Sequence, residues 1–335
     1  MKNLNTHKNY LLRKVVRIKN IGWISKLIRY LKRLVIPGFQ GVPFWEVMKF
    51  FLESVFKGVL FQRAAAMTYN IFMALIPMLM ALIATLSFLG DSLQQYLINF
   101  IQSILPDNAW EFVSQILNDL IQRQNNTIFW LSLGLGVYLT FICINSIINS
   151  LNITYFKMRR RNGIKQLPIS FIMVIGFYLV ILLACGIFLG SSHLIRIIGD
   201  YFGDSGTFYH ISILLVRWLL IFALVYTMLS SLFYFAPYDK KYFHFFSAGS
   251  MFSTITLMLL MTALNLYFSH FSAYNVVYGS IGALLIILLC IYWGAAVVLI
   301  GFDLNVSICI AKQFRVSEDE EWKIESTIQE QDIIE

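Results

Sequence analysis

The stretch from Met67 to Gly90, "MTYNIFMALIPMLMALIATLSFLG", is almost wholly apolar and has a proline near its centre. A helix needs about 20 consecutive apolar residues to cross the hydrocarbon core of a bilayer. Pro77 cannot donate to the carbonyl of Met73, and its ring crowds the preceding turn. Membranes tolerate such breaks because neighbouring groups satisfy the freed carbonyl. The stretch predicts a membrane-spanning helix whose break at Pro77 serves packing, a gating hinge or a binding site.

The composition of the whole chain agrees with this reading. Of its 335 residues, 58% are hydrophobic and only 13% are charged, and the mean hydropathy is +0.70. A soluble domain carries about 25% charged residues. The four cysteines form no CxxC pair, so we expect buried free thiols, with neither a disulfide framework nor a metal site. The chain is therefore predicted to be one polytopic membrane domain without a cofactor.

Further apolar segments of spanning length follow the first one. The predicted fold is all-α, with six transmembrane helices preceded by amphipathic interfacial helices, since the alternating pattern of a barrel strand is absent. The predicted spans are about 66–90, 127–150, 167–190, 210–236, 243–270 and 278–305. They form a membrane domain from 64 to 310, between a basic segment at 1–63 and an acidic tail at 311–335 that we expect to be disordered.

Basic residues predict the orientation of these spans. The segments 1–63, 151–166, 237–242 and the C-terminal tail hold 23 of the 26 Lys and Arg residues. Positive loops stay in the cytoplasm, so we expect both termini there. The net charge of +8 then reflects attraction to anionic inner-leaflet lipid rather than to nucleic acid.

Amphipathic segments flank the membrane domain. In "IGWISKLIRYLKRLVIPGF" the apolar and basic residues occupy opposite helical faces, which predicts an interfacial helix over 21–36. A second helix follows Pro43, and its Glu53 and Lys57 can pair at i, i+4. The segment from 91 to 126 is predicted to form two short amphipathic helices that cap the far side of the bundle, with a lid or a partner surface as the alternative.

Polar residues at membrane depth are the candidate functional residues, because burying them is costly. Arg217 can snorkel to the outer interface, or it can be functional. Asp303 is explained by solvation at a helix end, as a buried acid paired with a basic loop residue, or by proton coupling. Uncharged polar residues form one stripe in the second span and one in the fifth, either as interhelical contacts or as the lining of a hydrated cavity. The stripes are Asn145, Asn149 and Asn152, and Ser247, Ser250, Thr254, Thr262 and Asn265.

Four segments of the chain resemble the YihY/BrkB family of bacterial inner-membrane proteins. The first is "RAAAMTYNIFMALIPMLMAL", and the second is "SLNITYFKMRRR" at the end of the second span. The third is "FYFAPYDKKYFHFFSAG", and the fourth is "LYFSHFSAYNVVYGSIGALLIILLCIYWGAAVVLIGFDLN". The matching residues are Ala65, Ala66, Tyr69, Pro77, Asn152, Tyr155, Pro237, Gly249, Tyr267, Tyr278, Gly279, Ser280, Gly282, Gly301, Asp303, Leu304 and Asn305. Cys290 departs from a frequent Trp of the family, and Asp303 departs from its usual Glu.

The resemblance covers about 45–310 and implies six helices in the bacterial inner membrane. It also implies transport or export of a lipid or small molecule, while some members of the family once carried the label ribonuclease BN. A zinc nuclease needs clustered His and Asp ligands, and the five histidines here are scattered. A transporter or exporter is therefore our first hypothesis, and a membrane enzyme is disfavoured. An envelope-organising or anchoring protein is the alternative, and homo-oligomer formation is left open.

One cavity hypothesis connects these candidates. We expect Pro77, Tyr69 and the fifth-span stripe through Thr254, Thr262 and Asn265 to line a cavity that opens alternately. A proline-broken span beside polar residues is typical of the interrupted helices of secondary transporters.

Overall fold

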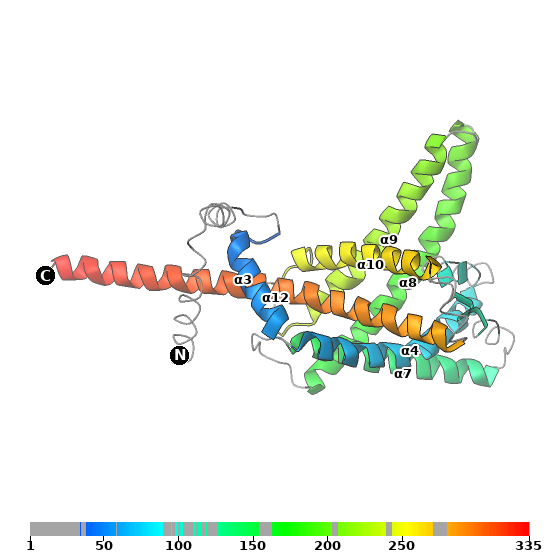
Figure 1. Ribbon diagram of the computed structural model, residues 1–335, viewed down its shortest axis with the longest axis horizontal. Helices are drawn as coiled ribbons and strands as arrows, with labels where there is room; N and C mark the ends of the chain where they lie inside the picture. Colours follow the sequence, from blue (N-terminus) through cyan, green and yellow to red (C-terminus); the bar gives the residue numbers. More distant parts are fainter. Residues whose placement is uncertain are drawn as a thin grey trace.

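The computed structural model describes residues 34, 38–57, 59–89, 126–153, 163–202, 207–238, 243–270 and 280–334, with scattered positions between 95 and 118. All regular elements in these residues are α-helices (Figure 1). They are α3 (Phe44–Lys57), α4 (Leu60–Leu89), α7 (Asn126–Asn152), α8 (Gly163–Phe202), α9 (Thr207–Phe235), α10 (Ala248–His270) and α12 (Ser280–Ile334). The all-α fold predicted from the sequence is confirmed.

Within the described residues, five helices are long and apolar enough to cross a membrane. The qualifying stretches are Leu133–Asn152, Gly163–Leu183, Trp218–Phe235, Ala248–Tyr267 and Leu284–Val316. A sixth span results if α3 and the first part of α4, which meet at a bend of 68°, are counted together. The protein is therefore a multi-pass membrane protein. The exact number of six spans stays a prediction.

Six of the helices form a closed ring. Following the ring, α4 packs against α7, then α8, α9, α10 and α12 follow, and α12 returns to α4. Apolar side chains fill the centre of this ring, with Met67, Ile148, Met173, Phe233 and Phe302 each contributed by a different helix. Burial of such side chains contributes roughly 25 cal/mol per Å² in water, but in lipid close packing replaces this term. The ring is thus stabilised by close packing of side chains and by polar contacts.

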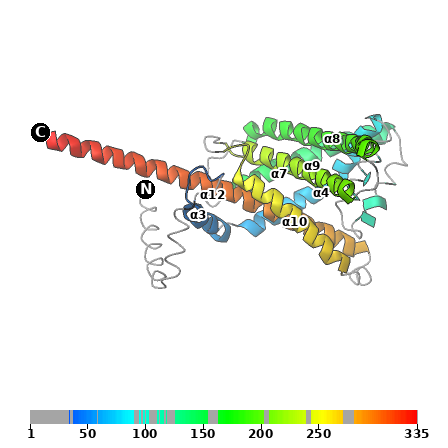
Figure 2. The ribbon, with the colours of Figure 1, turned by 90° about the horizontal axis from the view of Figure 1, so that it is seen from above.

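The two ends of the ring differ. At the end that contains Asp303, called the Asp303 end below, the helices converge and α3 crosses α12 (Figure 1). At the opposite end, called the far end, the hairpin of α8 and α9 diverges from α10 and α12, as both views show (Figures 1 and 2). The described residues of the segment between 91 and 126 pack here, with Val113 buried against Ile286 and Ile287.

The segments before α4 agree in part with the predictions. α3 begins directly after Pro43, and Lys57 pairs with Glu53 as the spacing predicted. One face of α3 contacts α12, since Val47 is buried beside Ile308 and Ala311. The helix predicted over 21–36 lies outside the described residues. Placement of these helices at a membrane interface stays a prediction.

The C-terminal tail differs from the prediction. We expected disorder over 311–335, but α12 continues without a break to Ile334. The physical reason lies in the residue types: after Gly301 the chain contains no Gly or Pro, and Glu, Gln, Lys and Ile dominate its last 20 residues. Most of these are good helix formers, and a helix already nucleated within the bundle extends at low cost.

The predicted orientation can be tested on two exposed positions of the structure. Ile164, at the start of α8, lies at the Asp303 end, and Asn118 lies in the segment between 91 and 126. In a background with the native cysteines replaced, we expect Asn118→Cys to react with an impermeant maleimide in intact cells. Ile164→Cys should react only after the membrane is opened, because basic flanks stay cytoplasmic. Labelling of Ile164→Cys in intact cells would contradict the orientation.

Candidate functional site

A buried ion pair joins the first residues of α4 to the middle of α12. Arg63 Nη1 lies 3.3 Å from Asp303 Oδ2 and 3.5 Å from Oδ1. Both side chains are inside the protein, with exposed fractions of 4% and 0%. Arg63 Nε also donates to the carbonyl of Ser150 on α7, at 2.8 Å. One guanidinium therefore holds three helices together.

The separation within this pair is longer than the 2.7–2.9 Å typical of charge-assisted hydrogen bonds. The short side chain of Asp303 limits how far its carboxylate reaches toward Arg63. Arg63 Nη2 is buried and has no hydrogen-bond partner among the described residues. A buried charge loses its hydration and is tolerated only when it is paired. The pair is thus costly to assemble and costly to break.

A second polar contact joins α12 to the start of α10. Asn305 Oδ1 accepts from the backbone N–H of Gly249 at 2.8 Å, and Asn305 Nδ2 donates to Ser247 Oγ at 2.9 Å. Ser247 is the N-cap of α10, because its Oγ accepts from the N–H of Ser250 at 3.2 Å. Asn305 therefore satisfies an N–H group that the first turn of α10 leaves free.

Glycines bring α10 and α12 close together beside this contact. A Cβ added to Gly249 would lie 2.1 Å from the carbonyl oxygen of Gly301, and one added to Gly301 would lie 1.7 Å from Ser253 Oγ. Ser253 itself donates to the carbonyl of Val297 at 3.3 Å. Gly249, Gly301 and Ser253 therefore mark a close contact between the backbones of α10 and α12.

These contacts make residues 301–305 of α12, "GFDLN", a junction of the Asp303 end. Gly301 and Asn305 face α10, and Asp303 faces α4. Leu304 is buried in the cluster formed with α3. Asp303 is a buried acid paired with a basic residue, as one of the three interpretations had it, but the partner lies in α4 and not in a loop. Arg63 was missed, because it was counted only among the cytoplasmic charges of 1–63.

The polar stripe in the second predicted span makes interhelical contacts. Gln166 Nε2 of α8 donates to Asn145 Oδ1 at 2.6 Å and to Asn149 Oδ1 at 3.1 Å, and Ser170 Oγ lies 3.3 Å from Asn145 Oδ1. Asn152 Nδ2 donates to the carbonyl of Ala236 at 3.1 Å. The Asn side chains of α7 therefore link it to α8 and to the end of α9. Gln166 was not singled out in the sequence.

Pro77 lies where α4 and α7 approach most closely. A Cβ added to Gly136 of α7 would lie 2.3 Å from the carbonyl oxygen of Pro77 and 2.5 Å from Ala81 Cβ. About two turns earlier, Asn70 Nδ2 donates to Ser146 Oγ at 2.9 Å. The carbonyl of Pro77 thus faces a glycine of the neighbouring helix.

The remaining candidate residues lie in different surroundings. Thr254 is fully buried and donates to the carbonyl of Ser250, whereas Thr262 and Asn265 are exposed on α10. Tyr69 has an exposed fraction of 64% on α4. Tyr278, Gly279 and the side chain of Arg217 lie outside what the structure describes. No described contact joins Tyr69 to the stripe of α10.

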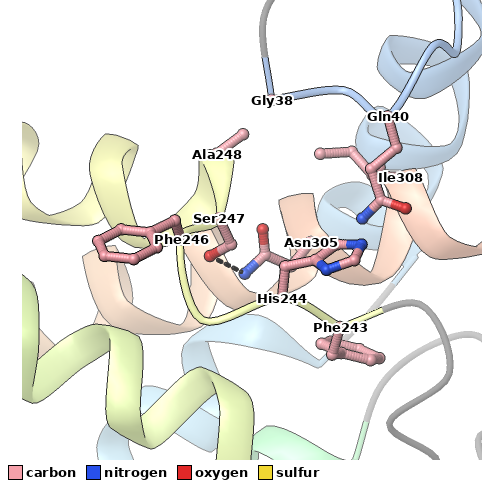
Figure 3. A pocket seen from close by; sticks show the side chains of 9 residues that line it. All are labelled: Gly38, Gln40, Phe243, His244, Phe246, Ser247, Ala248, Asn305 and Ile308. Carbon is pink, nitrogen blue, oxygen red and sulfur yellow. Dashed lines mark hydrogen bonds between the residues drawn. The ribbon is translucent and has the colours of Figure 1, made fainter.

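A small cavity of about 190 Å³ opens beside the junction (Figure 3). Its wall combines the turn before α3, the loop before α10 and the junction itself. It is lined by Gly38, Gln40, Phe243, His244, Phe246, Ser247, Ala248, Asn305 and Ile308. Gly38 adopts a φ of +93°, which favours glycine, and lets the turn approach Ala248. Sites for drug-sized ligands occupy about 300–1,000 Å³, so this cavity is too small for a whole lipid.

Comparison with known proteins identifies the family. The sequence profile of the family described as virulence factor BrkB matches residues 52–324. The chain belongs to this family. The BrkB match includes α4 and the junction at 301–305, and it confirms the resemblance inferred from the sequence.

Several BrkB relatives have been named. The chain is 24% identical over 243 residues to the "Putative ribonuclease-like protein YfkH" of Bacillus subtilis, which covers 72% of this chain and 88% of that protein. It is 26% identical over 257 residues to the "UPF0761 membrane protein MS0032" of Mannheimia succiniciproducens, covering 73% and 83%. A Psychrobacter UPF0761 membrane protein is 24% identical over 290 residues, which is 81% of this chain but 51% of that longer protein. No solved structure matches the chain.

The ribonuclease-like name of one relative can be compared with the residues present. The described residues contain no group of three or more His, Cys, Asp or Glu side chains that could hold a metal ion. The polar groups that do converge, around Arg63, Asp303 and Asn305, are engaged in contacts between helices. These contacts join α4, α7, α10 and α12.

Proposed function

We propose that this BrkB protein is a transporter that exports a lipid or another envelope component across the bacterial inner membrane. On this proposal both termini lie in the cytoplasm, and the Asp303 end faces inward. The substrate is a lipidic or small molecule, and anionic inner-leaflet lipid contacts the basic flanks. Transport would alternate between the arrangement described above and one in which the Asp303 end opens.

The observation that carries the proposal is the difference between the two ends of the ring. The Asp303 end is closed by an apolar core and by contacts that are polar and discrete, namely the Arg63–Asp303 pair and the Asn305 contacts. At the far end the α8–α9 hairpin diverges from α10 and α12 (Figure 1). Each of these polar contacts can break and be replaced by another when the helices move. Such contacts suit a helix interface that alternates between two arrangements.

Exposed polar side chains support a path for the substrate. Asn265 and Thr262 lie on α10 toward the far end, and their side chains are exposed. An amide that faces hydrocarbon without a partner is costly, so Asn265 favours a position beside water, substrate or headgroups. We propose Tyr69, Thr262 and Asn265 as residues that contact the substrate, with Pro77 allowing α4 to bend.

A lipid-transfer assay tests this function. The purified protein is reconstituted into vesicles that contain a fluorescent phosphatidylglycerol, and the exposed probe is quenched with dithionite. We expect the protein to speed transfer of the probe between leaflets, and Asn265→Leu to slow it several-fold, because the new side chain removes a polar contact from the path. Leu259→Ala, on the exposed face of the same helix, is the control and should transfer the probe normally.

Thermal stability measured on the same samples separates function from folding. Tyr69→Phe and Pro77→Ala should slow transfer while the melting temperature of Tyr69→Phe stays unchanged. Wild-type vesicles that transfer the probe no faster than protein-free vesicles would contradict lipid export. If, in addition, all variants restored the phenotype of a strain that lacks the gene, an envelope-organising role would be favoured over lipid export.

A further inference from the structure

The last part of α12 is a rod that leaves the bundle. Beyond Val316 the helix continues to Ile334, and no other described helix lies beside it in either view (Figures 1 and 2). At 1.5 Å per residue, these 18 residues extend about 27 Å from the bundle. We call residues 317–335 the acidic arm.

The charges of the acidic arm destabilise an isolated helix. It contains eight Asp and Glu residues and one Lys, including Glu321 and Glu325 at i, i+4 and Asp332 near the C-terminus. Like charges at this spacing destabilise a helix, and acids at the C-terminus oppose the helix dipole. A source of positive charge alongside the arm would therefore stabilise this helix.

The same chain carries such a source. Residues 1–33, called the basic segment below, contain ten Lys and Arg residues and no Asp or Glu. They are followed by a turn that is attached to the base of the acidic arm. Lys312 Nζ donates to Gln40 Oε1 at 3.1 Å, and Arg315 Nη1 donates to the carbonyl of Gly41 at 3.0 Å.

Apolar contacts fix this attachment further. Phe39 and Val42 are buried against Leu304, Ile308 and Ala311 of α12. The N–H of Phe44 donates to the carbonyl of Leu34 at 2.9 Å, so the chain at the end of the basic segment also lies here. The basic segment thus ends next to a turn that contacts α12 where the acidic arm begins. Tethering at this range gives an effective concentration of the order of millimolar.

We propose that the basic segment docks on the acidic arm of the same chain. The contact neutralises the repulsion along the arm and draws the basic segment away from the membrane surface. Anionic lipid attracts the same Lys and Arg side chains. The interaction free energy for each side chain is about the same as that of an exposed ion pair. The arm and the inner leaflet therefore compete for one segment, and the composition of the leaflet decides the position of that segment.

Zero-length cross-linking of the full-length protein tests this docking. A carbodiimide joins a Lys amine to a carboxylate only when the two are in contact. In a neutral detergent at low salt, we expect Lys residues of 1–33 to be linked to carboxylates of 317–335. The yield should fall in high salt, which shortens the range of exposed charges to about 3 Å at 1 M. It should also fall in bilayers that contain phosphatidylglycerol.

A charge variant supplies the matched control. Glu318→Gln, Asp319→Asn, Glu320→Gln and Glu321→Gln together should lower the yield at Glu325 and Glu330 roughly tenfold, as expected from losing several exposed pairs. Glu46→Gln with Glu111→Gln, which removes acids elsewhere, should leave the yield unchanged. Absence of arm cross-links at low salt, or an equal yield in the four-site variant, would overturn the proposal. Links found only between light and ¹⁵N-labelled chains would overturn docking within one chain.

Discussion

Asp303→Asn is expected to lower the free energy of unfolding by about 3–5 kcal/mol, because it leaves the Arg63 guanidinium buried without its countercharge. The substitution keeps the size of the side chain and removes only its charge. Arg63 is 4% exposed and cannot reach water without moving α4. Denaturant or thermal unfolding of the purified protein in detergent measures the loss.

A double variant identifies charge as the cause. Arg63→Met with Asp303→Leu removes both charges, so we expect it to be more stable than either single variant. The surface pair of Glu53 and Lys57 is the matched control, since side chains of that pair are partly exposed. Lys57→Ala should cost about 0.3–0.5 kcal/mol. A double variant that is less stable than both single variants would show that side-chain packing, and not charge, stabilises this site.

The second large effect is expected at Gly136. A methyl group there would overlap the carbonyl of Pro77 and Ala81 Cβ, and the former is backbone that cannot rotate away. Overpacking costs about 1–3 kcal/mol even where side chains can shift, so Gly136→Ala should lose at least this much and should lower the yield of folded protein. Gly249→Ala meets Gly301 in the same way.

The control for this prediction lies two residues away on the same helix. Gly134 has nothing within 4 Å of an added Cβ. Gly134→Ala should therefore be neutral or slightly stabilising, because alanine favours the helix by up to about 1 kcal/mol. Equal melting temperatures for Gly134→Ala and Gly136→Ala would mean that α4 and α7 do not approach as closely as described.

The sequence predicted the helices well because bilayer thickness restricts their lengths. The apolar stretches around Pro77 and Trp218 each became a helix, and the Glu53–Lys57 spacing predicted its ion pair. Local patterns of this kind need no knowledge of distant contacts. The tail was predicted to be disordered because it is acidic. The helix propensity of the same residues, which favours the helix that α12 forms there, was not considered.

The site was predicted only in part, because its contacts are long-range. Asp303 was identified as a costly residue, but its partner lies far earlier in the chain and was counted as a surface charge. A rule that every acid at membrane depth needs a cation would have pointed to Arg63, which directly precedes the first apolar stretch. Nothing in the sequence indicated that Gln166 reaches two Asn side chains of α7.

The Arg63–Asp303 pair also has a consequence for how the protein is made. Its two members are 240 residues apart in the chain. At a synthesis rate of about 5–20 residues per second, roughly 10–50 s pass between the synthesis of Arg63 and the synthesis of Asp303. During that interval the guanidinium lacks its countercharge, so α4 cannot take its final place in the ring. Completion of the ring therefore depends on the last helix to be inserted, and chains truncated before Asp303 should be recognised by quality-control proteases.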